Sequence, residues 1–112
     1  MRVYIVGDVD SEVLYNISKR LIQHPQDNKL ELYVYTRNDL RYMEKLRDII
    51  LNNILLGLVI YERKLDNIVD DLSKLNECNN DFVLIGKDIP QETLDKLRKV
   101  IKEKHGLEVI DG

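Results

Sequence analysis

The chain has 112 residues, of which 44% are hydrophobic and 33% are charged, so we expect one soluble globular domain spanning residues 1–112. Its 17 Lys and Arg against 20 Asp and Glu give a net charge of −3, which argues against a nucleic-acid partner held by bulk electrostatics. The single cysteine, Cys78, excludes an intrachain disulfide and a cysteine-based metal site.

The first predicted strand covers residues 3–6, a buried β-branched run that ends at the turn of residues 7–10. A helix is expected next, because Val13, Ile17 and Leu21 recur at helical spacing. No signal-peptide pattern precedes this strand, so we expect a cytoplasmic protein.

The second predicted strand covers residues 32–35 and alternates apolar with polar positions, which indicates an edge strand with one solvated face. Tyr33 and Tyr35 share one of its faces, where they either form an exposed contact patch or pack under a helix. Apolar positions at helical spacing then predict a second helix over residues 40–50.

The third predicted strand covers residues 55–61, a continuous apolar run that is typical of a strand covered on both faces. A third helix follows with its apolar stripe over residues 65–75. Residues 82–85 and 107–110 predict the last two strands, and residues 90–105 predict the helix between them. The longest apolar run is too short to span a membrane.

Strands alternating with helices predict a three-layer α/β domain, in which helices cover both faces of a parallel sheet of four to five strands. Right-handed crossovers leave few topologies, and we expect the flavodoxin-like or receiver-like strand order 2-1-3-4-5. This order puts the alternating second strand and the short fifth strand at the edges.

The carboxyl ends of the strands form the rim where such sheets bind ligands. The residues expected there are Gly7, Asp8, Asp10, Ser11, Thr36, Arg37, Glu62, Arg63, Gly86 and Lys87. The carboxylates Asp8, Asp10 and Glu62 offer the oxygen ligands that Mg²⁺ prefers, beside positive charge for an anion. The alternative is that these residues cap helices, stabilise turns and line solvated loops.

Specific catalytic signatures are missing. The loop of residues 7–12 has one glycine and three acids, whereas a phosphate-binding loop is rich in glycine. A phosphoacceptor receiver requires Asp, Ser or Thr, and Lys at the ends of its third, fourth and fifth strands. This chain has Tyr61-Glu62, Gly86 and Asp111 at those places. No nucleophile with an adjacent base is evident, which favours a protein without catalysis and leaves Mg²⁺ as the one cofactor that the rim could hold.

Two segments resemble the small F subunit of archaeal and vacuolar-type rotary ATPases. Residues 3–11 read Val-Tyr-Ile-Val-Gly-Asp-Val-Asp-Ser, similar to that family's first strand and turn, and residues 58–62 end an apolar run with Tyr-Glu where the family has Thr-Glu. The resemblance implies a receiver-like fold and a non-catalytic, protein-binding role. The family's first-helix motif and its C-terminal helical tail have no counterpart here.

The sequence therefore favours a non-catalytic protein-interaction or regulatory module, such as a small subunit of a larger complex, with a protein partner or a second copy as its ligand. The expected contact surfaces are the rim and the edge strand at residues 32–35. The alternative is a magnesium-dependent nucleotide-binding or phosphate-handling protein that uses Asp8, Asp10 and Glu62.

Overall fold

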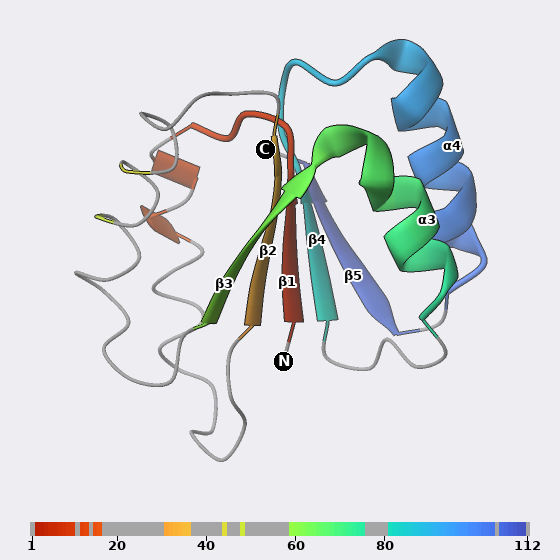
Figure 1. The fold of residues 1–112 in the computed structure, drawn as a ribbon, viewed down its shortest axis with the longest axis horizontal. Coiled ribbons are helices and arrows are strands. Elements are labelled where there is room, and N and C mark those ends of the chain that lie inside the picture. Colours follow the sequence, from red (N-terminus) through yellow and green to blue (C-terminus); the bar gives the residue numbers. More distant parts are fainter. Residues whose placement is uncertain are drawn as a thin grey trace.

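A single sheet of five parallel strands organises the computed structural model of the chain (Figure 1). The structure describes residues 2–10, 12, 13, 15, 16, 31–36, 44, 48, 59–75, 81–104 and 106–111, with residues 59 and 60 described by their backbone alone. The strands are β1 (Arg2–Val6), β2 (Glu31–Thr36), β3 (Val59–Lys64), β4 (Asp81–Ile85) and β5 (Leu107–Asp111). The predicted α/β class with a parallel sheet is confirmed.

The strand order is β3-β2-β1-β4-β5, so the expected order 2-1-3-4-5 is wrong. β2 lies between β1 and β3, and β3 instead of β2 is an edge strand. The observed order matches the first five strands of a Rossmann-type sheet, not the flavodoxin-like or receiver-like arrangement that the family resemblance implies.

Two features of the strands explain why β3, and not β2, lies at the edge of the sheet. The alternating positions of β2 carry tyrosines, and Tyr35 is only 1% exposed, so the alternation does not mark a solvated face. β3 begins at Val59 and runs through three consecutive charged residues, all of them exposed, which an edge strand tolerates. Of the predicted third strand, residues 55–58 lie outside the described part of the chain.

Two α-helices in the described ranges, α3 (Ile68–Ser73) and α4 (Gln91–Lys102), follow β3 and β4 and pack on the same face of the sheet (Figure 1). A short 3₁₀ helix, η1 (Leu65–Asn67), joins β3 to α3. Helical backbone also occurs at residues 12–13, 15–16, 44 and 48, in the connections that lead to β2 and β3. On the sheet face away from α3 and α4, Val3, Ile5 and Val34 are at most 1% exposed. Both faces of the sheet are therefore covered, as predicted.

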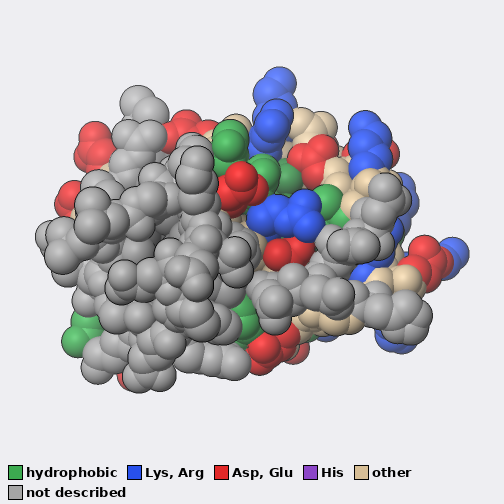
Figure 2. Space-filling view, turned by 90° about the horizontal axis from the view of Figure 1, so that it is seen from below, with side chains coloured by type: hydrophobic (Ala, Val, Ile, Leu, Met, Phe, Trp, Pro, Cys, Tyr) green, Lys and Arg blue, Asp and Glu red, His purple; other side chains and the backbone are tan. Residues whose placement is uncertain are grey.

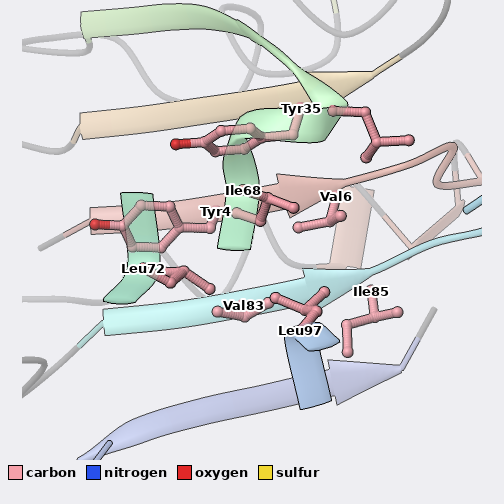
Figure 3. Packing of buried hydrophobic residues seen from close by; sticks show 9 residues of the cluster. Tyr4, Val6, Tyr35, Ile68, Leu72, Val83, Ile85 and Leu97 are labelled. Carbon is pink, nitrogen blue, oxygen red and sulfur yellow. The ribbon is translucent and has the colours of Figure 1, made fainter. Parts of the chain in front are cut away.

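The core beneath α3 and α4 joins the three central strands to both helices (Figure 3). It contains Tyr4, Val6, Tyr35, Leu65, Ile68, Leu72, Val83, Ile85 and Leu97. The predicted apolar stripes of the third and fourth helices supply Ile68, Leu72 and Leu97, each fully buried. Burial of each such side chain contributes about 1.5–3 kcal/mol, so this cluster is what holds the two helices on the sheet.

The ends of α3 and α4 are stabilised by polar contacts. Lys104, just after α4, donates its Nζ to the carbonyl oxygens of Ser73 at 3.1 Å and Leu75 at 2.6 Å, which satisfies the end of α3. Gly106 has a φ of 81°, the left-handed conformation expected of a glycine after a helix. No helix in the described ranges is long and apolar enough to cross a membrane.

Candidate functional site

The loops after β1 and β4 meet at the carboxyl ends of the strands, where the chain leaves β1 toward β2 and leaves β4 toward β5. In doubly wound sheets, this switch point opens into the ligand crevice. Here Asp8 and Lys87 form an antiparallel bridge across it. The Asp8 N–H donates to the Lys87 carbonyl at 2.8 Å, and the Lys87 N–H donates to the Asp8 carbonyl at 2.6 Å.

Two glycines let these loops approach each other so closely. A Cβ on Gly7 would overlap the Lys87 carbonyl oxygen and lie 2.7 Å from Ile89 Cγ1, and a Cβ on Gly86 would overlap the Asp8 carbonyl. Gly7 also has a φ of 77°, which favours glycine. Gly7, Asp8, Gly86 and Lys87, which we call the clasp, therefore fill the switch point with the chain's own backbone.

Side chains around the clasp are engaged with one another. Thr36 Oγ1 donates to Asp8 Oδ1 at 3.4 Å, a long hydrogen bond, and Lys87 Nζ pairs with Asp10 Oδ2 at 3.2 Å. Both members of the Lys87–Asp10 pair are mostly exposed, so the pair adds little stability. Asp88 follows with a φ of 61°, an uncommon conformation for a residue other than glycine.

The predicted rim is brought together only in part. Gly7, Asp8, Asp10, Thr36, Gly86 and Lys87 gather around the clasp. Glu62 and Arg63 lie instead within β3, in register with Val34 and Tyr35 of β2. Two strand spacings, about 10 Å, separate β3 from β1. Ser11 and Arg37 lie outside the described residues.

The three carboxylates proposed for magnesium are all described but do not form one site. Among residues 2–10, 59–75 and the other described ranges, no three His, Cys, Asp or Glu side chains are grouped so that they could hold a metal ion. Glu62 is kept from Asp8 and Asp10 because β2 stands between their strands. The strand order thus removes the geometry on which the predicted magnesium site depended.

A second cluster lies on the sheet face that α3 covers in part. Tyr4, Tyr33 and Tyr61 occupy matching register positions on β1, β2 and β3. Their rings stack with centroids 5.0 Å apart between Tyr4 and Tyr33 and 4.7 Å apart between Tyr33 and Tyr61. We call these three residues the tyrosine ladder. Tyr4 is buried, whereas Tyr33 and Tyr61 are partly exposed.

The two β2 tyrosines differ in their burial. Tyr35 packs under α3 and donates its hydroxyl to Asp71 Oδ2 at 2.6 Å. Burial, and then this hydrogen bond, raise the pKa of the Tyr35 hydroxyl. Tyr33 keeps some exposure and donates to Glu31 Oε2 at 3.0 Å. Its partial burial, followed by the bond to Glu31, raises the pKa of Tyr33 to about 12.

The amino ends of the strands have a different character. Arg2 pairs with the buried Asp81 through its guanidinium at 3.0 Å, and its backbone N–H donates to the same carboxylate at 3.0 Å. In the view onto this end, acidic and basic side chains of the described residues lie side by side (Figure 2). The described side chains at this end therefore include paired opposite charges.

Comparison with protein-family models, curated proteins and solved structures found no match. The sheet and the two residue groups described above are therefore the basis for assigning a function. The tyrosine ladder escaped the sequence analysis because its only signal was the pair on residues 33 and 35. The register that aligns Tyr4 and Tyr61 with Tyr33 depends on strand order.

Proposed function

We propose that this chain is a cytoplasmic, non-catalytic protein-interaction or regulatory module, of the kind that serves as a small subunit in a larger complex. The clasp is the observation that carries the proposal. Where Rossmann-type sheets open to admit a nucleotide, this chain hydrogen-bonds to itself through Asp8 and Lys87. A ligand entering there would first have to displace both backbone hydrogen bonds.

The basic residues of α4 support a protein over a nucleic acid as partner. Lys96 pairs with Glu92, and Arg98 pairs with Asp111. Lys104 is held by backbone carbonyls at the end of α3. Three of the five basic residues in α4 and just after it therefore have internal partners, so this segment has less charge to offer to phosphates.

The partly exposed tyrosines supply a reason to expect a protein partner. Tyrosine offers a large contact area with a polar tip and is enriched at protein interfaces. The resemblance to a rotary ATPase F subunit points to the same general role. That support is confined to the turn at Gly7-Asp8 and the Tyr61-Glu62 segment, because the sheet lacks the receiver-like strand order.

Thermal unfolding with a panel of nucleotides, with and without Mg²⁺, tests this proposal. A ligand present at 100 times its Kd stabilises the native state by about 2.7 kcal/mol, which raises Tm by several degrees. We expect no such rise. A magnesium-dependent rise that disappears in Asp8→Asn would overturn the proposal in favour of a nucleotide-binding or phosphate-handling protein that acts through Asp8.

A positive test is affinity capture from the native cell with matched baits. The wild-type chain is expected to retain a specific protein that Tyr33→Lys does not retain, whereas Lys99→Ala on the exposed side of α4 is expected to retain it. Circular dichroism checks that each bait is folded. Identical captures by wild-type chain and Tyr33→Lys would remove the tyrosines from the proposed contact surface.

A further inference from the structure

The tyrosine ladder ends on the edge strand of the sheet. Its ring spacings of 5.0 and 4.7 Å follow the spacing of adjacent strands, about 4.7–4.9 Å. Tyr33 stacks on one side of the Tyr61 ring, and β3 is the last strand of the sheet in the described structure. The next position of the stack would therefore belong to a strand added beside β3.

The direction in which the backbone N–H and C=O groups of Tyr61 point determines how an added strand would pair with this residue. The Gly7 N–H donates to the Tyr35 carbonyl, so the backbone N–H and C=O groups of Tyr35 point toward β1. Because these directions alternate along a strand, the backbone groups of Tyr33 also point toward β1. The backbone groups of Val34, which lies between them, point toward β3. Since Val34 is in register with Glu62, the backbone groups of the neighbouring Tyr61 point toward β2. Beside an added antiparallel strand, Tyr61 would thus occupy a non-hydrogen-bonded pair, in which side chains lie closest.

We propose, building on the interaction role proposed above, that the added strand is β3 of a second copy of this chain. The two copies would pair antiparallel about a twofold axis at Tyr61, the geometry of an isologous dimer. The two Tyr61 rings would then face each other and join two three-membered ladders into one stack of six rings.

The charges of β3 disfavour two of the neighbouring registers. A twofold axis at Glu62 or at Arg63 would place two like charges directly opposite each other, which is destabilising. An axis at Tyr61 places Arg63 opposite residue 59 of the second copy, an uncharged position. It also sets each Arg63 diagonally across from the other copy's Tyr61, within reach of a cation–π contact. The charged half of β3 therefore disfavours pairing centred on Glu62 or Arg63 and permits pairing centred on Tyr61.

Sedimentation equilibrium of the full chain tests the dimer. The mass of the wild-type chain is expected to rise from 13.2 kDa toward twice that value between micromolar and millimolar concentration. Tyr61→Phe keeps the ring and is expected to dimerise. Tyr61→Lys is expected to stay monomeric at every concentration, and Tyr15→Lys, a change of an exposed tyrosine elsewhere, is expected to behave as the wild type.

Cysteine cross-linking in a Cys78→Ser background tests the register. An equimolar mixture of Val59→Cys and Arg63→Cys chains is expected to form a disulfide-linked dimer, because positions 59 and 63 are opposite each other. Neither variant alone is expected to cross-link. Cross-linking of Arg63→Cys with itself, or a wild-type chain that stays monomeric, would overturn the proposal. A monomer that also ignores nucleotides would leave the interaction role intact and direct attention to another protein's strand.

Discussion

Tyr33 and Tyr35 show how differently two residues on one face of a strand can be used. Tyr35 is buried between the sheet and α3 and donates a hydrogen bond to Asp71, whereas Tyr33 is partly exposed within the tyrosine ladder. In both, burial followed by a hydrogen bond to a carboxylate raises the hydroxyl's pKa. The folded chain thus holds these two tyrosines in their neutral form.

The pH dependence of tyrosine ionisation follows from these shifts. Because the pKa of Tyr33 is raised from 10.0 to about 12, its contribution to stability is present below pH 10 and is lost as the pH rises through that interval. Absorbance titration of the folded chain should show Tyr33 and Tyr35 ionising above pH 10, and Tyr33→Phe should remove one late step. Ionisation of all six tyrosines in a single step near pH 10 would contradict these assignments.

Gly7 is the single residue on which the clasp most depends. Gly7→Ala would push a methyl group into the Lys87 carbonyl and the Ile89 side chain while straining the backbone, so we expect a loss of at least about 2 kcal/mol of unfolding free energy. Gly106→Ala is the matched control. Its φ is similar but the residue is exposed, so about 1 kcal/mol is expected. Urea unfolding measures both, and equal losses would count against the clasp.

Features that depend only on local residue spacing were predicted correctly from the sequence. The glycine after α4 and the buried positions of α3 and α4 could be read from spacing alone. Glu62 could not be placed, because its distance from Asp8 is set by how many strands separate them. Asp8 and Lys87 were expected at one rim, but the hydrogen bonds between their backbones have no sequence signature.

At the scale of elements, α3 depends on α4 for its stability. α3 has only six residues, too few for a stable isolated helix, and its end is satisfied by a lysine that follows α4. The two helices are therefore expected to form and unfold together.

Replacing Lys104 tests this dependence. Lys104→Ala leaves the carbonyl groups of Ser73 and Leu75 without their cationic donor, and we expect a loss of about 1–2 kcal/mol in urea unfolding. Lys102→Ala, an exposed change in the last turn of α4, is expected to cost less than about 0.5 kcal/mol. A Lys104→Ala variant as stable as Lys102→Ala would show that α3 does not depend on this contact.

β3 is the element that the sequence describes least well. The described strand continues past the apolar run into Glu62, Arg63 and Lys64, which read as a loop. Hydrophobic continuity indicates burial but does not say which strand lies beside it. β2 alternates apolar residues with tyrosines, and because a tyrosine can be buried or solvated, this alternation does not distinguish an interior β2 from an edge β2.

At the scale of the whole molecule, β1 and β4 are joined at both ends. The Arg2–Asp81 ion pair links the amino ends of these strands, and the backbone hydrogen bonds of the clasp link the loops at their carboxyl ends. The α/β class followed from the alternation of strands and helices, but the position of the third strand did not. If β3 lay beside β1, Glu62 would join Asp8 and Asp10 at one rim. With β3 at the edge, Glu62 lies away from them, and the clasp closes the switch point.

Hydrogen–deuterium exchange of the ligand-free chain tests the central claim, a switch point closed by the protein itself. The amides of Gly7, Asp8, Gly86 and Lys87 all donate to backbone carbonyls, so we expect them to exchange as slowly as the β1 amides beside them. Exchange of Asp8 and Lys87 at the rate of an open loop, while β1 stays protected, would mean that the crevice opens readily. That result would contradict the proposed non-catalytic role.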